Sequence, residues 1–125
     1  MLAIAPGWEL TVERGPDWLL VRILKGAEAR ELPPLADEVW EQLRRHFTYR
    51  LVLELNQIPV LDSHLIGQLV QLYKRIREHD GVMRVCGLSA YNRQVLHTCN
   101  LENHFPDYHD REEAVMGTRH PRQPR

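Results

Sequence analysis

The chain has 125 residues, of which 43% are hydrophobic and 26% are charged, and its formal net charge is −1. This length and composition are those of one globular domain with its own core, and they exclude a disordered chain. A dedicated nucleic-acid binder normally carries a marked basic excess, so the near-neutral charge argues against that class.

The first residues predict a β-hairpin. Residues 8–13 alternate apolar with polar side chains, which is the pattern of a half-buried strand. Residues 15–17 read Gly-Pro-Asp and supply a turn, and residues 18–24 are rich in Leu, Val and Ile. The two runs are expected to pair antiparallel. Residues 25–34, which contain two consecutive prolines, are expected to connect the hairpin to the next element.

The middle of the chain predicts a helix, a buried strand and a second helix. Apolar side chains at helical spacing indicate the first helix, namely Leu35, Ala36, Val39, Trp40, Leu43 and Phe47. Residues 51–55 form a nearly continuous apolar run, which suits a central strand covered on both faces. The second helix, over residues 63–79, has an apolar stripe of Leu65, Leu69, Leu72, Tyr73 and Ile76. Gly81 stands where a helix-ending glycine is expected.

The last part of the chain predicts shorter elements. Residues 82–86 are expected to form a strand, and Ser89 is placed to cap a third helix. One side of that helix is expected to carry Tyr91, Val95, Leu96 and Cys99. Residues 101–108 are expected to form a loop with a short edge strand, and Asp110 to cap a brief fourth helix.

The alternation of strand and helix after the hairpin predicts a single α/β domain. Its central sheet is expected to be mostly parallel, opened by the N-terminal hairpin, and accompanied by about four helices. The domain is expected to span residues 1–116. Residues 117–125 contain two prolines and three arginines and are expected to form a disordered basic tail.

The segment after the buried strand is the first candidate for a functional site. It reads Leu61-Asp62-Ser63-His64-Leu65-Ile66-Gly67. Asp62 or Ser63 is suited to cap the second helix, whose positive end also favours an added negative charge such as phosphate. Open α/β sheets place functional loops beyond the carboxyl ends of their strands. Taken alone, however, this stretch is best explained as an ordinary helix cap.

A longer series of residues adds to this interpretation. It comprises the strand at 51–55, Leu61-Asp62-Ser63 with Gly67, the helix residues Leu69, Tyr73-Lys74-Arg75 and Glu78, then 81–85, Ser89, Val95-Leu96, Leu101, Phe105 and 112–115. In this order and spacing the chain resembles the STAS family, the domain of anti-sigma-factor antagonists. The resemblance covers roughly residues 8–116. It implies a module that binds a protein partner, often a protein kinase that also sequesters a sigma factor.

The resemblance also implies a phosphorylation switch at the start of the second helix. In the family, phosphorylation of a Ser or Thr in the motif Asp-Ser-Ser/Thr-Gly-apolar-Gly abolishes binding. Asp62, Ser63 and Gly67 match the motif, whereas His64 stands at the phosphoacceptor position and Leu65 replaces the glycine after it. An imidazole cannot replace a hydroxyl as the acceptor for a serine/threonine kinase. The bulky leucine is expected to keep a partner away from the backbone.

Three interpretations of the altered motif remain open. The protein binds its partner constitutively, the switch has moved to Ser63, or the chain is a divergent STAS module that serves another complex. We rank constitutive or divergent binding above a relocated switch. The candidate phosphoacceptor is Ser63, and the expected partner-binding residues are Asp62, Ser63, His64, Leu65, Gly67, Ser89 and Asn92.

No residue pattern indicates catalysis, a metal or a cofactor. His97, Cys99 and His104 are close in sequence, but the chain has neither a Cys-x-x-Cys pair nor a His-Glu-x-x-His helix. Asp62, Ser63 and His64 are consecutive, and neighbouring helix residues point in different directions, which argues against a catalytic triad. We therefore expect a protein that is not an enzyme and that holds no cofactor or metal.

The sequence also favours a cytoplasmic protein without membrane insertion. Its two cysteines cannot form a disulfide framework, which favours a reducing compartment. The apolar start, residues 1–6, is too short for a signal peptide and lacks basic residues. The longest apolar runs fall well below the roughly 18 residues that a membrane span needs.

The sequence as a whole favours a regulatory module that resembles an anti-sigma-factor antagonist and binds a kinase-like anti-sigma factor. The alternative is a structural STAS subunit of a larger assembly, such as a lipid-transport ABC complex or a stress-sensing particle. A small ligand-binding or enzymatic α/β protein is a third and more distant interpretation.

Overall fold

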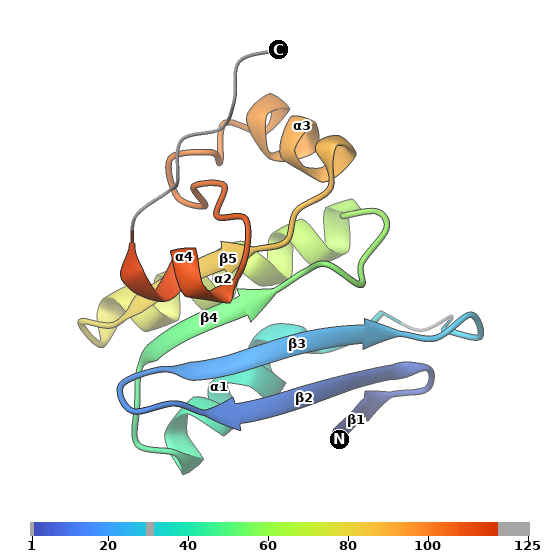
Figure 1. Cartoon of the computed structure of the whole chain (residues 1–125). Coiled ribbons are helices and arrows are strands. Elements are labelled where there is room, and N and C mark those ends of the chain that lie inside the picture. Colours follow the sequence, from blue (N-terminus) through green and yellow to red (C-terminus); the bar gives the residue numbers. More distant parts are fainter. Residues whose placement is uncertain (1, 30–31, 118–125) are drawn as a thin grey trace.

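The computed structural model describes residues 2–29 and 32–117, which form a sheet flanked by helices (Figure 1). In chain order the elements are β1 (Leu2–Ala5), β2 (Trp8–Arg14), β3 (Leu19–Lys25), α1 (Leu35–Arg45), β4 (Arg50–Glu54), α2 (Ser63–Glu78), β5 (Val82–Cys86), α3 (Ala90–Thr98) and α4 (Arg111–Met116). The predicted α/β domain with an N-terminal hairpin and about four helices is confirmed.

The strands form one sheet in the order β1-β2-β3-β4-β5. The pairs β1–β2 and β2–β3 are antiparallel, and the pairs β3–β4 and β4–β5 are parallel. Parallel neighbours need crossover connections, which α1 and α2 supply. The sheet is more mixed than expected because Leu2–Ala5 adds an antiparallel edge strand that the sequence did not predict.

The main core lies between the sheet and the helices α1 and α2, which lie behind the strands in Figure 1. Strand side chains alternate between the two faces of a sheet, so Leu19, Val21 and Ile23 of β3 all face these helices. All three are wholly buried. Burying an aliphatic side chain of this size stabilises a fold by about 1.5–3 kcal/mol.

The opposite face of the sheet is covered by α4 where it passes over β4 and β5 (Figure 1). A smaller buried cluster lies there, made of Trp18, Val52, Cys86, Tyr108 and Ala114. Arg84 of β5 lies over the Trp18 ring at 5.1 Å and donates a hydrogen bond of 2.8 Å to the Ala114 carbonyl. That bond satisfies a carbonyl at the end of α4, where the helix itself offers no donor.

Two predictions for the last part of the chain are wrong. Residues 101–108 form no strand, and a single parallel bridge joins Tyr108 to Cys86 instead. In α3 the buried side chains are Asn92 and Leu96, whereas Tyr91 and Cys99 are exposed. This side of the helix faces inward, where the Asn92 side chain forms hydrogen bonds with the backbone of the loop after β4.

Phe47, which the sequence pattern assigns to the apolar stripe of the first helix, lies beyond its end. The helix α1 stops at Arg45, and Phe47 has a φ of +52° and a side chain that is 91% exposed. Its spacing of four from Leu43 fits a helix. The chain nevertheless leaves the helix here because β4 must begin at Arg50.

The C-terminal boundary is only partly visible. Gly117 follows α4 with a φ of +70°, a conformation that glycine adopts readily. Residues 118–125, most of the predicted disordered basic tail, lie outside the described residues.

Candidate partner-binding site

The loop between β4 and α2 is held in place by one buried side chain of α3. Asn92 accepts a hydrogen bond of 2.9 Å from the Leu61 amide and donates one of 3.0 Å to the Ile58 carbonyl. Its side chain is wholly buried. Since a buried polar group left without a partner costs about 1–3 kcal/mol, these two bonds strongly favour this one shape of the loop.

Ser89 sets the position of Asn92. The Ser89 hydroxyl accepts a hydrogen bond of 3.1 Å from the Asn92 amide, which makes it the N-terminal cap of α3 as predicted. Both residues were expected to contact a partner. Asn92 does not fit that role because its side chain is buried, and it instead positions the loop from beneath.

The start of α2 follows the predicted capping pattern. The carboxylate of Asp62 accepts a hydrogen bond of 2.9 Å from the Leu65 amide. This occupies Asp62 and leaves Ser63 as the exposed first residue of the helix. The Ser63 hydroxyl therefore lies at the positive end of the helix dipole, where added negative charge is favoured.

His64 connects α2 to the start of α1. Its Nε2 atom lies 2.8 Å from the Pro33 carbonyl oxygen, and since a carbonyl only accepts, this nitrogen carries the proton. One turn further along α2, Gln68 accepts a hydrogen bond of 2.8 Å from the Ala36 amide. Pro34 has no side chain able to cap α1, so Gln68 takes over that role. The imidazole of His64 thus supports the fold.

Leu65 and Gly67 lie on different sides of α2. Leu65 is only 3% exposed and packs into the main core, so the expectation that it keeps a partner off the backbone is wrong. Gly67 is exposed, and a Cβ atom added there would meet nothing within 4 Å. A glycine inside a helix costs about 1 kcal/mol relative to alanine, and no contact within the described residues requires it.

Exposed apolar side chains lie in the segments that hold this helix start. Among the described residues, five large hydrophobic side chains are exposed, and three of them are Leu32, Val60 and Tyr91. Leu32 precedes the Pro33 that bonds His64, Val60 lies in the loop, and Tyr91 precedes Asn92. We call residues 59–67 together with Leu32 and Tyr91 the corner surface.

The surface expected from the sequence, residues 59–67, the exposed side of the second helix and the start of the third helix near 89–93, includes Val60 and Tyr91 but not Leu32. The sequence did not predict that an exposed apolar rim lies there, and it placed Tyr91 on the same side of the third helix as Leu96. The Ser89 cap could have shown which side of α3 faces inward, because it determines the residue at which α3 begins. Asn92 and Leu96, four residues apart, then share its inner side, and Tyr91 falls outside it.

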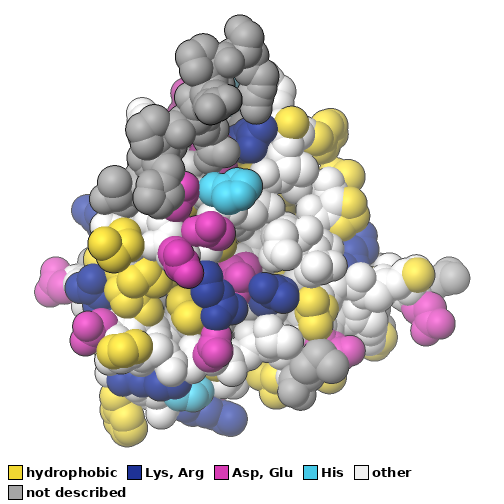
Figure 2. Space-filling view, viewed as in Figure 1, with side chains coloured by type: hydrophobic (Ala, Val, Ile, Leu, Met, Phe, Trp, Pro, Cys, Tyr) yellow, Lys and Arg dark blue, Asp and Glu magenta, His cyan; other side chains and the backbone are white. Residues whose placement is uncertain are grey.

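A cluster of charged side chains, separate from the corner surface, lies where β4 ends, on the face of the sheet that α4 covers. The buried carboxylate of Glu54 accepts hydrogen bonds from Arg22 at 3.1 Å and from Arg111 at 2.6 Å. Arg111 also pairs with Glu13, and its bonds to these two carboxylates raise its pKa. Figure 2 shows charged side chains of both signs meeting on this face. The cluster anchors the first residue of α4 to three strands.

Cys86 is buried beside this cluster. Burial, followed by the nearby charges of Glu54 and Asp110, raises the pKa of the Cys86 thiol to about 12. A thiol with such a pKa stays protonated at neutral pH, so it is neither a good nucleophile nor a ready metal ligand. Among the described residues, no three His, Cys, Asp or Glu side chains gather as a possible metal site.

A cleft of about 330 Å³ opens between α3 and the loop that follows it. Leu88, Leu96 and Phe105 contribute apolar surface to it. Arg93 and Asp107 line it as well and lie 3.5 Å apart, so their charges largely compensate each other. Glu102 also lines the cleft and pairs with His97 at 2.7 Å.

Comparison with known proteins identifies the family. The model of the STAS domain matches residues 19–114, which is most of the chain. The chain belongs to the STAS family. The resemblance inferred from the sequence is therefore confirmed. The corner surface lies within the residues that the STAS model matches.

Solved structures share this fold at low sequence identity. An anti-sigma factor antagonist from Mycobacterium paratuberculosis has a TM-score of 0.73 and 20% identity, over 93% of this chain and 98% of that one. The Bacillus cell fate determinant SpoIIAA in its phosphorylated form has a TM-score of 0.65 and 13% identity, over 87% and 98%. A stressosome structure has a TM-score of 0.66 and 12% identity, over 86% and 94%.

One curated relative is a much larger protein. YvdB of Bacillus subtilis (strain 168), named as a sulfate transporter, is 29% identical to this STAS domain over 65 residues. The match covers 48% of this chain and only 12% of YvdB. Within the described ranges 2–29 and 32–117, no helix is long and apolar enough to span a membrane.

Proposed function

We propose that this STAS domain is a non-enzymatic regulatory module that binds a kinase-like anti-sigma factor through the corner surface. The observation that carries the proposal is that Leu32, Val60 and Tyr91 are exposed, and that each is next in sequence to a residue whose hydrogen bonds hold the start of α2 or the loop before it. Apolar and aromatic side chains with a polar surround are typical of protein interfaces. The anti-sigma factor antagonist from Mycobacterium paratuberculosis, which shares the fold, supports this choice of partner.

The helix backbone at Gly67, which no side chain covers, allows a partner to approach α2 closely. Ser63 and Gly67 are four residues apart and therefore lie on the same side of the helix, and both are exposed. Glycine allows another chain to come near the helix backbone. The direct contacts proposed for the interface are thus Ser63 and Gly67 with the apolar rim. The conformation of this surface is stabilised by hydrogen bonds of four side chains, those of Asp62, His64, Ser89 and Asn92.

We further propose that the usual phosphorylation switch is altered or lost. His64 occupies the acceptor position and is engaged with the Pro33 carbonyl, which favours constitutive binding. Ser63 is the remaining hydroxyl at the helix start. A phosphate there would add up to about two negative charges beside Asp62, which the helix would tolerate and an acidic partner would oppose.

A second candidate function is that of a structural subunit in a larger assembly. The likeness to a stressosome chain and the partial match to the transporter-named YvdB support it. In such an assembly the corner surface would be occupied permanently, and the loss of a phosphoacceptor at position 64 would be without consequence.

The proposal is tested by capture of partners from a lysate of the native host. The baits are the wild-type chain, Ser63→Asp, Ser63→Ala and, as a matched control, Thr98→Asp, which adds the same charge at the far end of α3. Ser63→Asp should fold normally because an acid at the first helical position is favoured by the dipole. Captured proteins are identified by mass spectrometry, and affinities are measured by titration.

The antagonist function is supported if wild type, Ser63→Ala and Thr98→Asp all capture a kinase-like anti-sigma factor. A switch at Ser63 is supported as well if the affinity of Ser63→Asp for that factor is lower by about tenfold or more. Equal capture by all four baits supports constitutive binding. Recovery of transporter or scaffold subunits in place of any kinase would reject the antagonist function in favour of the structural subunit.

A further inference from the structure

The end of α1 has an unusual residue at a demanding backbone position. The Phe47 amide donates to the Arg44 carbonyl and the Thr48 amide to the Leu43 carbonyl, both at 3.2 Å. This pair of bonds is the Schellman motif, in which the residue after the C-cap adopts the left-handed conformation. Phe47 is that residue, with a φ of +52°.

The other helices show which residues normally occupy this position. After α2 it is Asp80, with a φ of +56°, and after α3 it is Asn100, with a φ of +59°. In α4 the left-handed residue is Gly117, one position earlier, at the C-cap itself. Glycine, asparagine and aspartate tolerate the left-handed conformation, whereas a bulky residue adopts it at a cost in folding stability. Phe47 alone departs from this pattern among the helices described.

Packing does not compensate for the strain at Phe47. Its side chain is 91% exposed, the highest value among the exposed large hydrophobic side chains of the described residues. The two hydrogen bonds that end α1 need this backbone conformation but not an aromatic side chain, and the exposed ring adds little packing. Strained residues persist where the surrounding structure imposes them, and they cluster at functional sites, so Phe47 is a candidate for a function.

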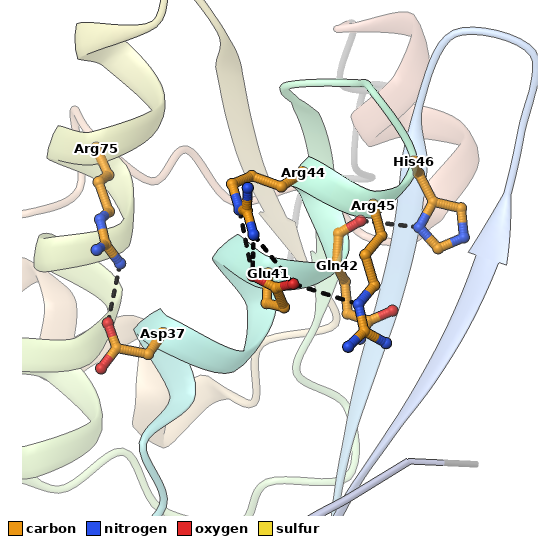
Figure 3. Close-up of polar contacts among 7 residues, drawn as sticks. All are labelled: Asp37, Glu41, Gln42, Arg44, Arg45, His46 and Arg75. Atoms are coloured by element: carbon orange, nitrogen blue, oxygen red, sulfur yellow. Dashed lines mark hydrogen bonds and ion pairs between the residues drawn. The ribbon is translucent and has the colours of Figure 1, made fainter.

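The surroundings of Phe47 are basic. Arg44 and Arg45 precede it and share the single carboxylate of Glu41, at 2.9 and 3.3 Å, so this group keeps a net positive charge (Figure 3). The shared contacts hold the pKa of Glu41 below its usual value. Arg50 lies over the Trp18 ring at 4.5 Å and pairs with no carboxylate among the described residues.

The neighbouring turn does not cancel this charge. The Thr48 hydroxyl donates to the Asp17 carbonyl at 3.5 Å, so the turn between β2 and β3 lies beside Phe47. That turn contributes the carboxylate of Asp17, and Arg14 is the last residue of β2 before it, so the two add no net charge. We call residues 44–50 the Phe47 tip; it combines one protruding aromatic ring with a positive excess.

We propose that the Phe47 tip docks this STAS domain onto an anionic phospholipid surface. Phe47 would enter the boundary between headgroups and acyl chains, and Arg44, Arg45 and Arg50 would contact lipid phosphates. A bilayer accepts a single aromatic side chain without a matching pocket and attracts cations through its anionic lipids. The domain lies on such a surface and does not cross it.

A protein partner fits this end of the molecule less well. Stable protein interfaces bury a cluster of apolar side chains, and the Phe47 tip presents one exposed ring. Phe47 lies just before the amino end of β4, whereas the corner surface follows the carboxyl end of the same strand. The two surfaces therefore lie at opposite ends of the sheet, and lipid contact at one leaves the other open.

The test is co-sedimentation of the full chain with vesicles of pure phosphatidylcholine and with vesicles containing one third phosphatidylserine. Wild type is expected to bind the anionic vesicles only, and less at higher salt. Phe47→Asn should lower the partition coefficient at least fivefold while raising the melting temperature, because asparagine relieves the strain. Arg50→Gln should lower binding more modestly. Val60→Ser, at the corner surface, should leave lipid binding unchanged.

Three results would overturn the proposal: no preference of wild type for anionic vesicles, equal binding by Phe47→Asn, or cross-links from position 47 to a protein in place of lipid. A retained affinity of Phe47→Trp supports it, since tryptophan favours the same interfacial depth. The lipid test and the partner test can fail independently. Val60→Ser is expected to weaken capture of the partner and to leave lipid binding unchanged, whereas Phe47→Asn is expected to weaken lipid binding.

Discussion

Single residues at the corner surface have separable effects on stability and binding, and Gly67 shows this most clearly. Replacing Gly67 by alanine removes the backbone freedom of glycine inside a helix, and the added methyl group meets no other atom. The free energy of unfolding should rise by about 1 kcal/mol. The same methyl group stands where a partner approaches the backbone, so affinity for the captured partner should fall several-fold.

The matched control is Gln71→Ala, one turn further along the same exposed side of α2. It should change neither quantity by more than a few tenths of a kcal/mol. Urea denaturation measures stability, and titration with the captured partner measures affinity. If Gly67→Ala binds as tightly as wild type, Gly67 lies outside the interface.

What the sequence predicted at this scale was the capping chemistry. Asp62, Ser89 and Asp110 cap their helices as expected, because a cap depends on a residue and its next three neighbours. The roles of His64 and Asn92 were not predicted. Each bonds to a residue about thirty positions away in the chain, and such partners become visible only in the folded structure.

Among the secondary-structure elements, α4 is a short helix held at both ends by long side chains. Arg111 joins its first turn to Glu54 and Glu13, and Arg84 binds its last carbonyls. Beneath it lies Cys86, whose thiol keeps its proton because burial raises its pKa to about 12. Alkylation of Cys86 therefore requires α4 to detach, which restores an ordinary thiol pKa.

This arrangement predicts slow labelling of Cys86 that depends on Arg111. In a Cys99→Ser background at pH 8, Arg111→Met should speed alkylation about tenfold, which corresponds to a loss of about 1.4 kcal/mol in the closing of α4. Arg93→Met, which loses the contacts of Arg93 with Asp107 and with the Leu88 carbonyl and none with α4, should leave the rate unchanged. Mass spectrometry follows the reaction. A rate insensitive to Arg111 would show that α4 is held by its apolar contacts alone.

The elements that the sequence misplaced are those determined by tertiary contacts. β1 contains only residues 2–5, too few for a periodic pattern, and its pairing with β2 creates it. The helix α1 ends two residues before Phe47 although the apolar spacing continues, because the strand that follows must start. Strong periodicity over a long segment, as in α2, was predicted within one residue of its observed end.

At the scale of the whole molecule, the sheet is shared by two buried clusters, one under α1 and α2 and one under α4. Their side chains alternate along the same strands, so that Leu51 and Leu53 belong to the first cluster and Val52 to the second. Loss of the sheet removes both clusters at once. The domain should therefore unfold as one cooperative unit, as small single domains usually do.

The three tryptophans allow this cooperativity to be measured in separate places. Trp8 lies in the first cluster and Trp18 in the second, whereas Trp40, in the middle of α1, stacks on Tyr49 at 5.3 Å. Three variants each keep one tryptophan and carry phenylalanine at the other two positions. In each variant the urea midpoints from fluorescence and from far-UV circular dichroism should coincide, with a slope of about 1–3 kcal/mol/M. A fluorescence change at lower urea in the Trp18 variant alone would show that the face under α4 opens before the sheet, and the molecule would then consist of two units of unequal stability.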